Sequence, residues 1–293
     1  MHLTDKIKQT NMSTDEKEVH RMFMKSLEED AYVDISEEIK EPPIAISCGE
    51  VVMTTLKGNT TYTIPLATYG NFSFIQAPPK SMKTYFVSLL VSTYLKDSNK
   101  FSGHIKGLRD KRKVIHFDTE QGRYHAQKVF RRPVDMNAGD VDDDYHTYAL
   151  RKMSYTERID FIEYVLYDNL ESKNIGLVVI DGIADLVSDV NNITESSEIV
   201  QRVMKWTAEL NCHIITVIHS NFGSTKPTGH LGSFLEKKTE TQISLEKNTQ
   251  NKGWVTVSCK RSRSFSFDDF SFKVNEAGLP EVVNMDYING LPI

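Results

Sequence analysis

The sequence has few cysteines, no long hydrophobic run and no excess of positive charge. Its 293 residues include three cysteines, Cys48, Cys212 and Cys259, which are far apart and form no CxxC pair. This spacing argues against a zinc site or a disulfide framework and is typical of reduced thiols in a cytosolic protein. No run of about 18 apolar residues is present, so we expect no membrane span and a cytoplasmic location. The N-terminus also lacks the apolar segment of a secretory signal.

The charge balance limits the kinds of partner. The net charge of -5 argues against a generally basic nucleic-acid-binding protein, so any contact with DNA must come from local patches. A hydrophobic content of 39% and a charged content of 26% are ordinary for a soluble globular protein. The length suits one large α/β domain with a small appendage.

The chain divides into an N-terminal segment, residues 1–43, and a main domain, residues 44–293. We expect residues 1–12 to be mobile. Ser13 and Glu16 form a capping box that predicts a helix over 14–30, followed by an acidic linker that ends at two prolines. The apolar positions of this helix could dock on an adjacent protomer or cover the core of the same chain; they are Val19, Met22, Phe23, Met24 and Leu27.

In the main domain, short apolar runs alternate with helical stretches. Strands are predicted over 71–75, 113–120, 175–181 and 213–220, and helices over 83–95, 154–170 and 196–210. Continuous apolar strands separated by helices indicate an α/β fold with a mostly parallel sheet flanked by helices. After residue 240 the sequence predicts only strands, at 241–246, 254–260, 270–274 and 281–287. We expect these to extend the sheet as antiparallel edge strands.

The first strand leads into FIQAPPKSMKT, which lacks both glycines of the phosphate-binding pattern GxxxxGK[ST]. Ala77 and Met82 stand at those positions, but the Lys83-Thr84 pair is intact. Lys83 would reach the β- and γ-phosphates and Thr84 would bind Mg²⁺. We expect helical backbone angles at Met82, which would avoid strain. An ordinary strand-to-helix turn is the alternative. The predicted phosphate-binding residues are Ala77, Pro78, Pro79, Lys80, Ser81, Met82, Lys83 and Thr84.

Three further strands also end in polar residues. Asp118 and Glu120 follow the second strand, and Glu120 is a candidate base that activates water; a helix-capping acid is the alternative. Asp181 ends LVVID and could hold Mg²⁺, although many strands end in Asp for turn reasons. His219, followed by Asn221, could sense the γ-phosphate or be a simple hydrogen-bonded residue. Because parallel strands end at one sheet edge, the joint pattern favours a nucleotide site there.

This arrangement resembles the RecA-like P-loop ATPases, and within them the RepA and DnaB group of hexameric helicases, from about Tyr69 to Arg263. QAPPKSMKT, HFDTEQ, LVVID and VIHSN carry the resemblance, together with GHLGSFLEKKTETQISLEK. The chain also resembles RepA-related ATPases of Bacteroidetes mobile elements. The resemblance implies ATP and Mg²⁺ as cofactors. It also implies a homo-oligomeric ring or filament, and single-stranded DNA and other replication or mobilisation proteins as partners.

The resemblance implies that Lys83 binds phosphate and that Thr84 and Asp181 hold Mg²⁺. It also implies that Glu120 is the base and that His219 senses the γ-phosphate. The family's RGS arginine is replaced by Leu231, so no arginine finger can be placed there. VTVSCKRSRSF offers Lys260, Arg261 and Arg263 at the end of a late strand, where relatives supply cations across a subunit boundary. A solvated basic turn is the alternative.

Two charged segments lie outside this pattern. The basic segment 96–113 could contact phosphates of single-stranded DNA, although a solvated loop is favoured because Phe101 is its only aromatic residue. The acidic segment 139–146 lacks the spacing of an EF-hand and is predicted to be a surface loop.

Three functions are compatible with these observations. The leading hypothesis is an ATPase that acts on DNA in replication or mobilisation of a mobile element. A non-hydrolysing nucleotide-binding adaptor or helicase loader is the second, motivated by Met82 and the absent arginine. A P-loop kinase for a small molecule is the third, and the lack of an Arg-rich lid argues against it.

Overall fold

The computed structural model describes residues 13–56, 58–96, 105–110, 112–139, 143–169, 174–221, 224 and 226–283. The chain forms two compact units, Met1–Glu41 and Pro42–Ile293. The segment expected to be mobile, residues 1–12, lies outside the described residues. No helix within the described ranges is both long and apolar enough to cross a membrane.

The N-terminal unit contains helix α2, Thr14–Ala31, which begins at the predicted capping box. The Glu16 amide donates to Ser13 Oγ at 3.3 Å, and the Ser13 amide donates to Glu16 Oε2 at 2.7 Å. These two bonds satisfy amides that the first turn leaves without an intrahelical partner. Val19, Met22 and Phe23 are exposed within this unit.

The second unit is built on a nine-stranded sheet in the order β12-β11-β10-β9-β3-β8-β7-β5-β6. Strands β9, β3, β8, β7, β5 and β6 are parallel, and β10, β11 and β12 are antiparallel. The predicted fold class is therefore confirmed, with one correction: the first late strand, β9, pairs parallel to β3. The strands are β3 (Phe72–Ala77), β5 (Lys113–Asp118), β6 (Tyr145–Ala149), β7 (Ile175–Asp181), β8 (His213–His219), β9 (Thr241–Lys247), β10 (Trp254–Ser262), β11 (Phe270–Val274) and β12 (Pro280–Val283).

Helices cover both faces of the sheet. Alternation along β7 shows the two faces, because Leu177 and Val179 belong to one apolar core and Val178 and Ile180 to the other. The first core includes α3 and the second includes α6, in agreement with a sheet buried on both sides. The helical segments are α3 (Lys83–Leu95), α4 (Arg123–Met136), α5 (Tyr155–Glu163), the π-helical turn η1 (Tyr164–Asp168), the 3-10 turn η3 (Ile183–Leu186), α6 (Ile193–Leu210) and α7 (Gly229–Lys238).

Several predicted boundaries need correction. The helix expected over 154–170 is α5 followed by the π-helical η1, and residue 170 lies outside the described residues. The strand expected over 281–287 is β12, which starts one residue earlier at Pro280; residues from 284 onward are not described. Helix α4 and strand β6 were not predicted, because α4 is rich in arginine and contains Pro133, while β6 follows an acidic turn.

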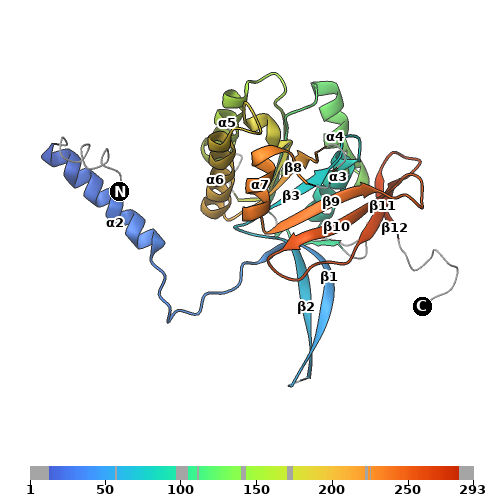
Figure 1. The fold of residues 1–293 in the computed structure, drawn as a ribbon, viewed down its shortest axis with the longest axis horizontal. Coiled ribbons are helices and arrows are strands. Elements are labelled where there is room, and N and C mark those ends of the chain that lie inside the picture. The colour runs from blue at the N-terminus through green and yellow to red at the C-terminus, as the bar shows by residue number, and fades with distance from the viewer. Residues whose placement is uncertain are drawn as a thin grey trace. The chain divides into compact units, whose positions relative to one another are not determined.

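A second, three-stranded sheet has the order β2-β1-β4 and contains β1 (Ile44–Thr55), β2 (Gly58–Thr68) and β4 (Ile105–Gly107). Strands β1 and β2 project from the rest of this unit as a two-stranded ribbon (Figure 1). Their outer halves are exposed, whereas Ala45, Ile46 and Leu66 near the base are buried. The base of the ribbon is thus anchored in the core.

Both charged segments were partly misassigned as loops. The basic segment contains β4, in which Ile105 is buried, and Arg109 beyond it is only 6% exposed. Arg109 pairs with Asp144 at 3.2 Å, because a buried guanidinium requires a partner. Residues 97–104 and 111 of that segment lie outside the described residues. The acidic segment runs directly into β6, so Tyr145 and His146 belong to a strand.

Candidate functional site

The loop between β3 and α3 presents backbone amides at one sheet edge. Ala77 ends β3, and Lys83 begins α3 and is buried. Within the described residues, the amides of Ser81, Met82, Lys83 and Thr84 donate to no other group. Free amides at a helix N-terminus, together with the helix dipole, favour an anion. The loop therefore keeps the donors that a phosphate requires, although it contains no glycine.

Met82 does not have the helical backbone that the sequence analysis expected. Its angles are φ 61° and ψ 27°, in the left-handed region, and Lys80 also has a positive φ of 60°. The expectation was wrong because the loop must reverse direction immediately before α3, as a glycine at this position would allow. For a residue with a Cβ, this conformation costs about 1–2 kcal/mol. The Met82 side chain is half-buried against the apolar core that contains α3, and this contact offsets part of the cost.

A chain of three side chains links the loop to neighbouring strands. Lys83 Nζ lies 2.9 Å from His219 Nδ1 and donates to the Pro78 carbonyl at 3.4 Å. His219 Nε2 lies 3.3 Å from Glu120 Oε1. The His219 hydrogen bond is the main cause that lowers the pKa of Glu120, and Lys83 contributes in the same direction. Burial lowers the pKa of Lys83, while Asp181 and Glu120 oppose that shift.

Two buried carboxylates lie beside this chain, because Asp118 on β5 and Asp181 on β7 are in register. Asp118 Oδ1 accepts from the amides of Glu120 and Gln121 at 3.1 and 2.8 Å. Its Oδ2 is buried and has no hydrogen-bond partner among the described residues. Burial, followed by the nearby carboxylates of Asp118 and Glu120, raises the pKa of Asp181 to about 7. Burial likewise raises the pKa of Asp118. Such a site favours a proton, a cation or water beside the carboxylates.

The donor set fits a magnesium ion that is shared with phosphates. Within the described residues, no group of three or more His, Cys, Asp or Glu side chains converges as a metal site. Magnesium beside a nucleotide usually takes only one or two carboxylates and completes its shell with water and phosphate oxygens. Asp181 and the Thr84 hydroxyl could supply the protein's share, and the unpaired Asp118 oxygen is consistent with an ordered water there.

A network of hydrogen bonds that was not predicted joins the segments after β5 and β7. Thr119 Oγ1 lies 2.8 Å from Asp185 Oδ2 and accepts a hydrogen bond from the Gly182 amide at 2.8 Å. Arg158 donates to the carbonyls of Asp185 and Thr119 at 2.7 and 3.4 Å. The peptide bond between Asp181 and Gly182 is cis. These contacts connect the segments that carry Glu120 and Asp181. The position of Thr119 directly before Glu120 was the only signal for them in the sequence.

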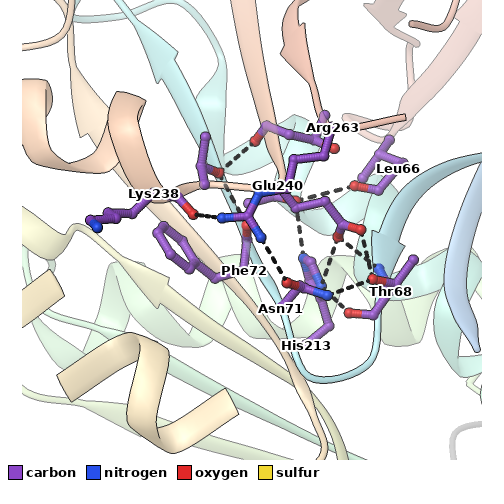
Figure 2. Close-up of polar contacts among 11 residues, drawn as sticks. Leu66, Thr68, Asn71, Phe72, His213, Lys238, Glu240 and Arg263 are labelled. Atoms are coloured by element: carbon purple, nitrogen blue, oxygen red, sulfur yellow. Dashed lines mark hydrogen bonds and ion pairs between the residues drawn. The ribbon is translucent and has the colours of Figure 1, made fainter. Parts of the chain in front are cut away.

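Arg261 and Arg263 lie near the amino ends of the parallel strands, at the opposite end from the β3–α3 loop. Arg261 pairs with Gln242 near the start of β9, and the first residue of β9 pairs with Ser73 near the start of β3. The β3–α3 loop instead follows the end of β3. Arg263 Nη2 donates to the Lys238 carbonyl at 2.7 Å and Nη1 to Asn71 Oδ1 at 3.5 Å (Figure 2). The structure therefore does not bring these arginines to the β3–α3 loop of the same chain. Lys260 is paired with Glu246 at 3.3 Å.

Arg263 borders a buried polar cluster centred on Glu240 (Figure 2). Thr68 donates to Glu240 through its amide at 3.0 Å and its hydroxyl at 2.6 Å. His213 Nδ1 lies 2.7 Å from the Thr68 carbonyl. Burial raises the pKa of Glu240, and burial lowers the pKa of His213 to about 4. The cluster joins the end of β2 to the starts of β8 and β9, so it is a structural connection at the opposite ends of the parallel strands from the β3–α3 loop.

The second unit has a RecA-like α/β fold, and its β3–α3 loop and buried carboxylates lie at the carboxyl ends of parallel strands, where open α/β sheets bind ligands. The AAA domain family matches residues 64–224, more than half of the sequence, and the chain belongs to that family. Among solved structures, the RadB recombinase has a similar fold, with a TM-score of 0.52 and 18% identity. That similarity covers 74% of this chain and 92% of the RadB chain. No curated protein matches the sequence.

Proposed function

We propose that this protein binds ATP with Mg²⁺ and hydrolyses it while acting on DNA, as a helicase or helicase-like ATPase in replication or mobilisation of a mobile element. The observation that carries the proposal is the Lys83–His219–Glu120 chain, which lies beside buried Asp181. A binding cation, a linking imidazole and an ionised carboxylate together supply what phosphoryl transfer to water requires.

Each of these residues has a distinct proposed role. Lys83 and the free loop amides bind the β- and γ-phosphates, and Thr84 and Asp181 hold the magnesium ion. Bound magnesium neutralises charge on these phosphates. Glu120 accepts a proton from the attacking water, because the lowered pKa of its carboxyl keeps it ionised near neutral pH. His219 separates Lys83 from Glu120 and would have to give up its contact with Lys83 when phosphates bind.

The proposal includes assembly into a ring or filament. Arg261 and Arg263 are far from the loop within one chain, which supports a role only toward the nucleotide of a neighbouring copy. Arg263 is held by Lys238 and Asn71, so its approach to a neighbouring phosphate requires those two hydrogen bonds to break. Single-stranded DNA and other replication or mobilisation proteins are the proposed partners.

The test is steady-state ATP hydrolysis with Mg²⁺, with and without single-stranded DNA. Wild type should turn over ATP faster with DNA, and Lys83→Ala should abolish turnover. Lys205→Ala is the control because it removes an exposed lysine from α6 and should leave turnover unchanged. Absence of turnover under all conditions, with a monomer at high protein concentration, would contradict the proposal.

A non-hydrolysing adaptor or helicase loader is the second candidate, and Met82 favours it. Its left-handed backbone lets the loop turn into α3 without a glycine. However, its Cβ lies next to the amides that would contact phosphate and would hinder that contact. In that case the protein binds ATP tightly and does not turn it over. Loss of measurable turnover in Glu120→Gln, relative to an active wild type, would exclude the adaptor.

A further inference from the structure

A large groove lies at the outer edge of the nine-stranded sheet, away from the β3–α3 loop. It has a volume of about 1190 Å³ and is bounded by α4, the edge strand β6 and residues 149–153. Small-molecule pockets usually have about 300–1,000 Å³. The groove therefore has room for a ligand longer than a single small molecule.

Positive charge lines both walls of this groove. Arg123 and Arg131 extend from α4, and Arg151 and Lys152 extend from the segment after β6. All four side chains are exposed, and none forms an ion pair with another described residue. No Asp or Glu among the described residues lines the groove. Four cations without an acid are unusual in a chain whose net charge is -5, so the groove is a local basic patch.

The cations on α4 form a row. Arg123, Gln127 and Arg131 are four residues apart and all line the groove. At about 1.5 Å per residue, this row spans roughly 12 Å. Asp144, directly before β6, forms an ion pair with Arg109 and does not line the groove, so it does not neutralise this row. An extended polyanion is the ligand that matches such a row.

Aromatic rings lie on both walls of the groove. Tyr124 lines the groove and is 65% exposed, and Lys128 Nζ lies 4.6 Å from its ring centroid. Tyr148 and Phe161 line the other side in an edge-to-face pair with centroids 5.4 Å apart. Exposed rings beside cations are the features that bind single-stranded nucleic acids, because bases stack on the rings and phosphates contact the cations.

We propose that this groove binds single-stranded nucleic acid, with its phosphates along the α4 row and a base on Tyr124. The inference rests on the proposed function for the choice of DNA as the natural ligand. It places binding in a different segment from the basic stretch 96–113 considered in the sequence analysis. A peptide that paired with the β6 edge would not need four exposed cations, so nucleic acid is the better match.

The experiment measures binding of fluorescent oligo(dT) to the full chain by anisotropy, without nucleotide and over a series of salt concentrations. The variants are Arg123→Gln/Arg131→Gln and Tyr124→Leu. Lys237→Gln/Lys238→Gln is the control, because it removes two exposed charges from α7. Each lost phosphate contact should reduce the slope of log K against log salt by about 0.7. Two lost contacts should weaken binding about 25-fold at 0.1 M salt, because that slope acts over the decade up to about 1 M.

The expected result is a smaller salt slope for the arginine variant, weaker binding for Tyr124→Leu, and wild-type binding for the control. Unchanged affinity and slope in both groove variants would overturn the proposal. So would a loss of self-association without loss of oligo(dT) binding, because the groove would then be a contact between copies. ATP turnover is measured separately. If the wild type hydrolyses ATP but the groove variants bind oligo(dT) as it does, only the groove proposal is refuted. If the groove variants lose oligo(dT) binding but the wild type does not hydrolyse ATP, only the proposed ATPase activity is refuted. Circular dichroism confirms that each variant is folded.

Discussion

Replacing Asp181 by asparagine should stabilise the nucleotide-free protein, and the gain should be larger at pH 8 than at pH 5. Asp181 is 6% exposed, and its pKa is raised from 3.8 to about 7. Between these two values the unfolded chain has released a proton that the folded chain keeps. The free energy of unfolding therefore falls as pH rises, by about 1.4 kcal/mol for each pH unit.

The size of the effect follows from the pH interval. Between pH 5 and pH 8, the wild type should lose roughly 3 kcal/mol of stability because of this group, and most of that loss falls below pH 7. Asparagine does not titrate, so the advantage of Asp181→Asn over wild type should grow by that amount between pH 5 and pH 8. The same substitution should abolish any stabilisation by Mg²⁺ with ATP, because it removes a proposed metal partner.

The assay is urea unfolding followed by circular dichroism in EDTA at pH 5 and pH 8. Asp160→Asn serves as the control, because it makes the same chemical change at an exposed position on α5. Its difference from wild type should stay within about 0.5 kcal/mol at both pH values. If the Asp181→Asn difference is also independent of pH, then burial does not hold this carboxyl in its protonated form and the reasoning is refuted.

Three other substitutions test neighbouring parts of the structure. Met82→Gly should tighten ATP binding, because it relieves the left-handed strain of about 1–2 kcal/mol and removes a Cβ beside the loop amides; weaker binding by calorimetry would contradict this. His219→Leu should move the acidic limb of the pH–rate profile to higher pH, since the pKa of Glu120 rises when its hydrogen bond is lost; an unmoved limb would exclude Glu120 as the titrating base. Glu240→Gln should cost about 1–3 kcal/mol in urea unfolding, because one of the two Thr68 donors then faces an amide group, and a change below about 0.5 kcal/mol would show that the cluster tolerates it.

Continuous apolar runs made parts of the fold predictable. Helix α3 and strand β7 begin and end at the predicted residues, because each is a mostly apolar, mostly buried run between polar turns. Helix α4 was missed because five of its fourteen residues are basic or proline on an otherwise weak apolar pattern. The β1–β2 ribbon was missed because its outer half is exposed on both faces and shows no alternation.

The candidate site was predictable only where it follows from topology. The ends of parallel strands share an edge, so a sequence with polar residues after three strands predicts that Glu120, Asp181 and His219 lie near Lys83. Their contacts depend on side-chain packing, and their roles remain predictions. The left-handed Met82 was not predictable, because it depends on how sharply the loop must turn before α3. The capture of Arg263 was not predictable either, because its acceptors come from segments far apart in the sequence.

The place of β3 in the sheet has a consequence for the synthesis of the protein. β3 pairs with β8 and β9, and the last residue of β9, Lys247, follows Ala77 by 170 residues. At about 5–20 residues per second, a ribosome needs roughly 10–30 s to make that stretch. Until β8 has been made, both edges of β3 lack their partner strands and the loop after it has no His219 to contact Lys83; the second edge stays unpaired until β9 follows. Such non-local pairing is slow to form, so the nascent chain would expose an apolar strand until its final third has emerged, and nucleotide could stabilise the fold only after that point.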